Sequence, residues 1–346
     1  MSRIAPVRFD KRLAVVIPSY KVTDHVLGVI EAIGPEVQAI YVIDDCCPDG
    51  SGALVEQRCT DPRVTVIRHE ENKGVGGAVM TGYTAAIAAG ADVIVKLDGD
   101  GQMNPALIET IARPVLEGHA DYAKGNRFHS LWNVRQMPRV RLWGNAALSF
   151  LTKLSSGYWR VFDPTNGYTA IHAKAAQALE FRNISERYFF ETDMLINLGN
   201  ARAVVADVPM EAVYGDETSN LHIRNVLGQF FTKHMRELAK RIFYTYFLRD
   251  FNLASAQLLL GLILLAFGGV FGAIEWYISI STGAPASTGT VMLAVLPIIL
   301  GFQLFLNFLA LDMSNEPRTP IQPAPSLAEL LASAAPQPAR PGTAER

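Results

Sequence analysis

Residues 93–102 read VIVKLDGDGQ, a short apolar run that ends in two aspartates and a glutamine. Short runs rich in β-branched residues are typical of strands buried in a parallel sheet. Three earlier runs share this character: Leu13–Ile17, Ala39–Ile43 and Val64–Ile67. Helical patterns lie between them, at about 24–33, 51–58 and 77–89. The β-α-β-α order predicts an α/β fold with an open, mostly parallel sheet and flanking helices.

Polar residues follow three of these four runs. They are Pro18–Tyr20, Asp44–Asp45 and Asp98–Asp100. Parallel strands end at one edge of a sheet, and open α/β sheets bind their ligands at the carboxyl ends of the strands. The sequence therefore predicts a ligand site at this edge.

Two familiar motifs fit this chain poorly. Gly74–Gly77 invites a dinucleotide-binding interpretation, but it follows the third strand and Val79 stands where the third glycine belongs. The segment Asp98–Glu109 has the length of a calcium-binding loop, but such a loop needs glycine at its sixth position, where this chain has Met103. The dinucleotide-binding interpretation is therefore disfavoured, and the calcium-loop interpretation is rejected.

A third interpretation of the acidic turn fits better. Carboxylate and amide oxygens after a strand suit a hard divalent cation that carries a substrate diphosphate. We therefore predict that Asp98, Asp100 and Gln102 hold Mg²⁺ or Mn²⁺. The alternative is an ordinary solvated turn, which Asp and Gly also favour.

Composition excludes several other classes of protein. The 346 residues include 31 Lys and Arg against 33 Asp and Glu, a formal charge of −2, so no basic field predicts nucleic-acid binding. The three cysteines, Cys46, Cys47 and Cys59, match neither a zinc-site spacing nor a disulfide framework and are expected to be reduced thiols.

The last third of the chain is far more apolar than the rest. No charged residue lies between Asp250 and Glu275, or between Glu275 and Asp312. Each stretch has about the 20 residues that a helix needs to cross hydrocarbon. Residues 251–312 are therefore predicted to form a transmembrane hairpin with a tight turn at Ser281–Gly289.

The flanking residues predict how this hairpin is oriented. Lys and Arg precede the first span and Arg318 follows the second, which places the 1–220 domain and both termini in the cytoplasm, at an inner or cell membrane. Helical apolar spacing with interleaved basic residues predicts amphipathic juxtamembrane helices over 221–250. The Pro- and Ala-rich residues 313–346 are predicted to be a disordered tail, with one short helix starting at Ser326.

Two pairs of residues within the predicted spans can each be interpreted in more than one way. Gln303 and Asn307 share one face of the second span, and Gly268 and Gly272 form a small-residue pair on the first. Either pair could mark a seam within one hairpin or between subunits of a homo-oligomer, or could simply be tolerated in a membrane helix.

Several motifs together resemble those of one known family. These are Val16–Tyr20, Val42–Ser51, Asn72–Gly74, Asp98–Gln102, Gly125–Phe128 and Phe162–Gly167. They are similar to motifs of glycosyltransferase family 2, which has the GT-A fold, and within it to polyprenyl-phosphate glycosyltransferases such as dolichyl-phosphate mannose synthase. The resemblance covers roughly residues 11–312. Departures are Lys21–Val22 in the first motif and Thr218–Leu221 near the end of the domain.

The resemblance implies roles for particular residues. The nucleotide-sugar pocket would be formed by Pro18, Tyr20, Asp45, Asp49, Lys73 and Asp98. The catalytic residues would be Asp100, Arg127, Asp163 and Asp193, with Arg127 holding an acceptor lipid phosphate. Either Arg139 or Arg141 would supply a second acceptor arginine, and Arg224 is a candidate for steadying the leaving diphosphate.

The implied reaction moves a sugar from a nucleotide donor to undecaprenyl or dolichyl phosphate, with inversion and metal assistance. The alternatives are a transferase that extends a lipid-linked saccharide or cell-envelope exopolysaccharide, and a non-catalytic membrane scaffold. The sequence does not distinguish UDP from GDP donors.

Overall fold

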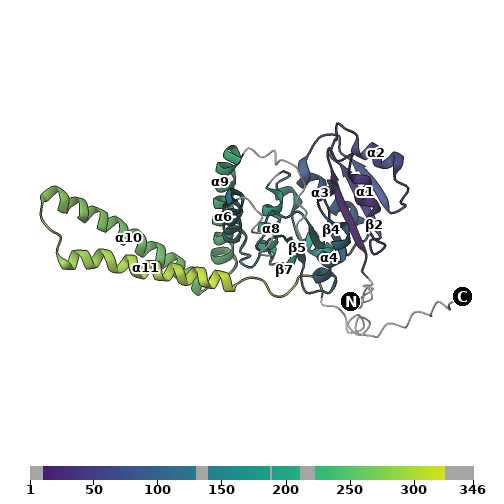
Figure 1. Ribbon diagram of the computed structural model, residues 1–346. Coiled ribbons are helices and arrows are strands. Elements are labelled where there is room, and N and C mark those ends of the chain that lie inside the picture. Colours follow the sequence, from purple (N-terminus) through teal and green to yellow (C-terminus); the bar gives the residue numbers. More distant parts are fainter. Residues whose placement is uncertain (1–10, 130–138, 188, 211–222, 324–346) are drawn as a thin grey trace. The chain divides into compact units, whose positions relative to one another are not determined.

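The computed structural model describes residues 11–129, 139–187, 189–210 and 223–323 (Figure 1). Over these ranges the chain forms two compact units. The first contains the described residues up to Ala146, those from Val161 to 210 and those from Pro317 onward. The second contains Ala147–Arg160 and the described residues from 223 to Glu316.

The first unit is built on a sheet with the strand order β3-β2-β1-β4-β6-β5-β7. The strands are β1 (Leu13–Ser19), β2 (Ala39–Asp44), β3 (Val64–Arg68), β4 (Val93–Lys96), β5 (Tyr122–Asn126), β6 (Thr169–His172) and β7 (Val205–Pro209). Strand β6 is antiparallel to β4 and β5, and the other neighbours are parallel. The mostly parallel α/β sheet is therefore confirmed, and the four predicted strands are β1–β4.

Helices connect and flank these strands. They are α1 (Val26–Glu31), α2 (Ser51–Arg58), α3 (Gly74–Ala88), α4 (Ile108–Leu116), α7 (Ala173–Gln177) and α8 (Phe190–Ala201), with 3-10 turns at Pro105–Leu107 and Phe181–Asn183. Helix α6 (Arg139–Ser156) begins in the first unit, and its residues from Ala147 onward belong to the second. Helix α4 buries Ile108, Ile111, Ala112 and Val115, the i, i+3, i+4, i+7 spacing of a core-facing stripe. Helix α3 begins three residues before its predicted start, so the whole glycine run lies inside it.

The second unit contains the three longest helices of the described chain. These are α9 (Ile223–Phe243), which continues into a π-helical turn (Tyr244–Arg249), α10 (Leu253–Thr282) and α11 (Thr288–Ser314). Helices α10 and α11 have a mean hydropathy of 2.2 over their most apolar windows. At about 1.5 Å per residue, both exceed the roughly 30 Å of a hydrocarbon core. The predicted pair of apolar helices is confirmed, with its turn at 283–287.

Small residues bring α10 and α11 into close contact, and the two helices lie side by side (Figure 1). A Cβ added to Gly268 would lie 2.7 Å from the carbonyl oxygen of Ala294, and one added to Gly301 would lie 2.8 Å from that of Gly261. A Cβ on Gly272 would lie 3.3 Å from that of Ala294. The Gly268 and Gly272 pair is therefore a seam inside one hairpin.

A buried polar cluster joins α9, its π-helical turn and the end of α11 within the second unit. Arg241 donates to both carboxylate oxygens of Asp312, at 2.7 and 3.0 Å. The Tyr246 hydroxyl and the Trp159 indole N–H also donate to Asp312, at 2.7 and 3.1 Å. Asp312 and Arg241 are only 4% and 7% exposed. Removing one partner of such a buried charge pair is strongly destabilising, because the other charge stays buried without compensation.

The chain beyond α11 returns to the first unit. The backbone N–H groups of Ile321 and Gln322 donate to the buried Asp121 carboxylate, at 2.9 and 2.8 Å, and the Gln322 amide donates to Val115 and Ala120. The structure thus differs from the predicted disordered tail over residues 313–323, because Asp121 supplies acceptors that the local sequence does not reveal. The remainder of that tail, including the helix predicted at Ser326, lies outside the described residues.

Candidate functional site

The strand register brings the predicted polar segments to one edge of the sheet. Ser19 at the end of β1 is paired with Asp44 at the end of β2, and β4 runs parallel to β1 on its other side. Pro18 and Tyr20 therefore stand beside Asp44–Asp45 and the turn that begins at Asp98. The Tyr20 side chain is 45% exposed, with the Lys21 ammonium 5.6 Å from its ring centroid. This exposed ring is available to stack on a planar ligand.

Asp45 organises the loop that carries Lys73. Its carboxylate accepts hydrogen bonds from the backbone N–H groups of Lys73 and Gly74, at 2.8 and 2.7 Å, and lies 2.8 Å from His69 Nδ1. It is 3% exposed. Its contacts are those of a residue that positions the Lys73 loop. Asp49 differs, since it is exposed just before α2.

The glycine run at the start of α3 serves close packing. The carbonyl oxygen of Glu186 accepts from the backbone N–H groups of Gly76 and Gly77, at 2.7 and 3.3 Å. A Cβ on Gly76 would lie 2.6 Å from the carbonyl oxygen of Ser185. Asp193 in turn accepts the Ser185 backbone N–H at 2.9 Å. Glycine is therefore required at position 76 by the close approach of the Ser185–Glu186 backbone. Asp193 supports the same loop through its hydrogen bond from Ser185.

The acidic turn after β4 is attached to a buried lysine. Lys96, 2% exposed, lies 2.8 Å from the Asp98 carboxylate and 3.6 Å from that of Glu191. Burial opposes the lysine charge, but Asp98 and Glu191 outweigh it and raise the pKa of Lys96 above its ordinary value. A Cβ on Gly167 would overlap the Lys96 ammonium and lie 3.0 Å from Asp98 Oδ2. Glycine at 167 thus leaves room for this ion pair.

The residues of this turn are of the chemical kind that could hold a divalent cation together with further oxygens from a ligand. Asp100 accepts the backbone N–H of Gln102 at 3.0 Å, so Asp98, Asp100 and Gln102 share one tight turn. Within the described ranges, no group of three or more His, Cys, Asp or Glu side chains could hold a metal ion. Two carboxylates and an amide oxygen need further oxygens from a ligand, and Mg²⁺ and Mn²⁺ commonly take these from phosphates.

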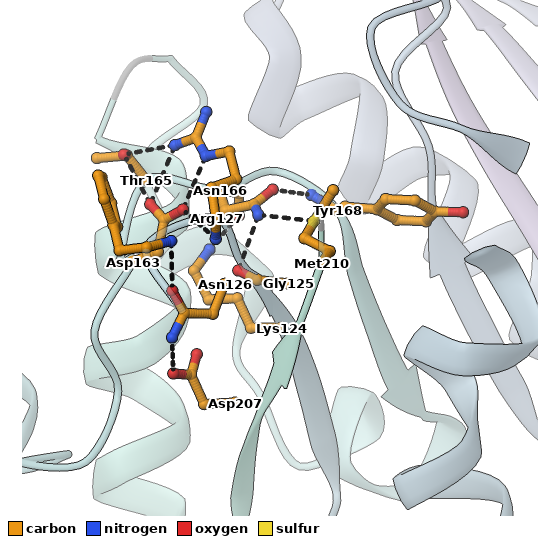
Figure 2. A network of polar contacts seen from close by, with 11 residues as sticks. Lys124, Gly125, Asn126, Arg127, Asp163, Thr165, Asn166, Tyr168, Asp207 and Met210 are labelled. Atoms are coloured by element: carbon orange, nitrogen blue, oxygen red, sulfur yellow. Dashed lines mark hydrogen bonds and ion pairs between the residues drawn. The ribbon is translucent and has the colours of Figure 1, made fainter. Parts of the chain in front are cut away.

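Arg127, at the end of β5, is fixed by a fully buried carboxylate (Figure 2). Its guanidinium donates to Asp163 through Nε at 2.7 Å and through a terminal nitrogen at 3.0 Å. Asp163 is 0% exposed, whereas the Arg127 side chain is 26% exposed. Bidentate charge-assisted pairing of this kind fixes the plane of a guanidinium. The geometry therefore gives Asp163 the part of a positioning residue.

Amides and a lysine support the strand end beneath Arg127 (Figure 2). Asn126 accepts the Phe128 backbone N–H at 2.8 Å and donates to Asp207 at 2.6 Å. The Lys124 ammonium, 0% exposed, donates to the carbonyl oxygen of Asn166. Burial lowers the pKa of Lys124 to about 8, and the carboxylates of Asp163 and Glu191 offset only part of this.

Sequence reasoning missed Lys96, Lys124 and Asn166, and the available signal was weak. Each lysine is the only charged residue within a short strand, VIVK or YAKGN. A single lysine within a short apolar strand more often indicates an exposed strand at the edge of a sheet. Three predicted arginines are not placed by the structure: the side chains of Arg139, Arg141 and Arg224 lie outside the described residues.

The chain has relatives among known proteins. Residues 14–179 match the family model described as glycosyl transferase family 2. The polyprenol monophosphomannose synthase of Mycolicibacterium smegmatis is 30% identical over 218 residues, which cover 60% of this chain and 79% of that protein. The UDP-N-acetylglucosamine–dolichyl-phosphate N-acetylglucosaminyltransferase of Methanococcus voltae is 28% identical over 219 residues, covering 59% and 87%.

Solved structures resemble the fold at lower identity. Glucosyl-3-phosphoglycerate synthase from Mycobacterium tuberculosis, crystallised with Mn²⁺, uridine diphosphate and phosphoglyceric acid, aligns with a TM-score of 0.51. It is 18% identical, and the match covers 67% of this chain and 78% of that one. The same enzyme was also crystallised with Mg²⁺ and uridine diphosphate. This likeness supports the GT-A type of sheet.

Proposed function

The chain belongs to glycosyltransferase family 2, and we propose that it transfers one sugar from a nucleotide-diphosphate donor to a polyprenyl phosphate. One observation carries the proposal: the segment Asp163–Gly167 connects the two halves of the site. Asp163 fixes Arg127, the carbonyl of Asn166 accepts from Lys124, and Gly167 lies against Asp98 and Lys96. This short segment thereby connects the acidic turn after β4, which would hold the cation, with the fixed arginine.

The donor half uses the turn after β4. Tyr20 would stack on the base, and Lys73, Asp45 and Asp49 would line the nucleoside pocket. A divalent cation held by Asp98, Asp100 and Gln102 would supply electrostatic stabilisation of the leaving diphosphate. The ion pair with the buried Lys96 would keep the Asp98 carboxylate in one orientation. One relative that is named for UDP-N-acetylglucosamine, and a solved structure of similar fold with bound uridine diphosphate, support this assignment.

The acceptor half uses Arg127. A phosphate monoester has a second pKa near 6, so at neutral pH the acceptor is already largely an anion and needs no strong general base. Arg127 would bind its oxygens while Asp163 keeps the guanidinium in plane. One acceptor oxygen forms a bond to the anomeric carbon as the bond to the donor diphosphate breaks. A single displacement of this kind inverts the anomeric centre.

The apolar hairpin explains how such an enzyme reaches its acceptor. A polyprenyl phosphate stays in the bilayer, so the transferase must be held at the membrane surface. Helices α10 and α11 have the length and hydropathy to span the membrane, and α9 with its exposed Phe231 and Phe243 would lie at the interface. The basic flank favours a cytoplasmic domain and cytoplasmic termini.

An extraction assay tests the proposal. Purified full-length protein in detergent receives undecaprenyl phosphate and, separately, labelled UDP-glucose, UDP-N-acetylglucosamine or GDP-mannose, with Mn²⁺ or with chelator. We expect label from one donor to enter the organic phase, and chelator to prevent it. Nucleotide binding without transfer to this lipid would favour a longer lipid-linked saccharide as acceptor, and no nucleotide binding would favour a scaffold.

A further inference from the structure

Helix α11 carries two amide side chains on the side that faces away from α10. Gly301 marks the α10-facing side, because an added Cβ there would lie 2.8 Å from the carbonyl oxygen of Gly261. At about 100° per residue, Gln303 lies roughly 200° around the helix from Gly301, and Asn307 is one further turn along. Both side chains are exposed. The structure thus excludes the interpretation that these amides form a seam within the hairpin.

These amides lack hydrogen-bond partners in the part of the chain that the structure describes. No hydrogen bond of the described residues involves the side chain of Gln303 or Asn307. Asp312, only a few residues further on, is satisfied by three different side chains. The helix therefore satisfies one polar group within its own unit and leaves two others without a partner.

The depth of the two amides makes this arrangement costly in a membrane. Gly301 is the midpoint of α11, Thr288–Ser314. At a rise of about 1.5 Å per residue, Gln303 lies about 3 Å and Asn307 about 9 Å from the midpoint along the axis. With the helix centred in the membrane, both fall inside a hydrocarbon core of roughly 30 Å. Lipid chains offer no hydrogen bonds, and an unsatisfied amide there is strongly disfavoured.

We infer that this face of α11 is a self-association surface on which a second copy of the chain docks through the same face. An amide is both donor and acceptor, so each amide complements an identical one. Two copies inserted in the same orientation place each residue at the same depth. Across a two-fold axis, Gln303 would meet Gln303 of the second copy and Asn307 would meet Asn307. Interhelical amide hydrogen bonds of this kind stabilise membrane-helix pairs.

Association of full-length protein in vesicles tests the inference, which rests on the membrane anchoring included in the proposed function. Copies labelled with donor or acceptor fluorophores are reconstituted in phosphatidylcholine vesicles, and energy transfer is followed as the lipid-to-protein ratio rises. We expect Q303L/N307L to weaken association by about tenfold. Leucine strengthens rather than weakens insertion, so resistance to alkaline extraction should be unchanged.

Two further variants make the result specific. The exchange Q303N/N307Q retains both amides and should retain association to within a few fold. Phe302→Leu alters an exposed residue at the same depth, about 100° around the helix, and should leave association unchanged. A monomeric wild-type protein in vesicles, or equal association of wild type and Q303L/N307L, would overturn the inference. If alkaline treatment removes the wild-type protein from the vesicles, the membrane anchoring is refuted instead. If the protein associates but transfers no sugar, only the proposed reaction is refuted.

Discussion

Replacing Asp163 with asparagine removes the negative charge that fixes Arg127 and keeps the shape of the side chain. Asp163 now accepts two guanidinium hydrogen bonds, at 2.7 and 3.0 Å, and is fully buried. An asparagine retains one acceptor oxygen, so one charge-assisted bond is lost, worth about 1.5–3 kcal/mol. If that energy serves to orient Arg127 toward the acceptor phosphate, the acceptor kcat/KM should fall about 10- to 150-fold.

Steady-state kinetics with each substrate varied in turn can measure this effect. The donor KM should change less than threefold, since the donor half depends on the acidic turn. Glu109→Gln is a matched control, because Glu109 pairs with Arg113 on the surface of α4 and such pairs contribute little. A thermal melt checks folding. An unchanged acceptor kcat/KM, or a rise confined to the donor KM, would refute the assigned role of Asp163.

Three further predictions follow from buried contacts. Gly167→Ala should displace Lys96 from Asp98 and raise the metal concentration needed for nucleotide binding at least tenfold in calorimetry; unchanged metal dependence would contradict this. The pKa of Lys124 is about 8 in the fold against an ordinary 10.5, so the unfolded chain binds the extra proton between these values and stability rises with pH. The free energy of unfolding of the wild type, relative to that of Lys124→Met, should therefore rise by about 2 kcal/mol between pH 7.5 and 9.5 in denaturant unfolding. A difference between the two proteins that does not change with pH would refute this prediction. Asp312→Ala leaves the Arg241 charge buried without its partner and should cost about 3–5 kcal/mol, visible as a lower melting temperature in detergent, whereas Ser314→Ala should have little effect.

Local patterns were sufficient to predict strands β1–β4 and the acidic turn, but not strands β5–β7. Each of the first four strands is a short run rich in apolar and β-branched residues, and three of them lead directly into a polar segment. Parallel topology then places these segments at one edge without further information. The hairpin was predictable for a similar reason, since hydropathy over about 20 residues depends on composition alone.

Contacts between distant residues were not predictable in this way. Asp163 and Arg127 are 36 residues apart, and the Gln322 backbone reaches Asp121 across 201 residues. The two buried lysines oppose ordinary strand preferences, because their charges are compensated only by the folded arrangement of carboxylates and carbonyls. The glycines of α3 likewise have a reason that appears only once the Ser185–Glu186 backbone is packed against them.

The central claim is that the acceptor is a lipid phosphate, and comparing two lipids tests it directly. Wild-type protein receives labelled nucleotide sugar with either undecaprenyl phosphate or undecaprenol, and label in the organic phase is counted. The account predicts transfer to the phosphate and none above background to the alcohol, because Arg127 needs an anion to bind and the alcohol lacks an ionised nucleophile. Equal transfer to both lipids, or transfer to neither while the same preparation glycosylates a lipid-linked saccharide, would contradict it.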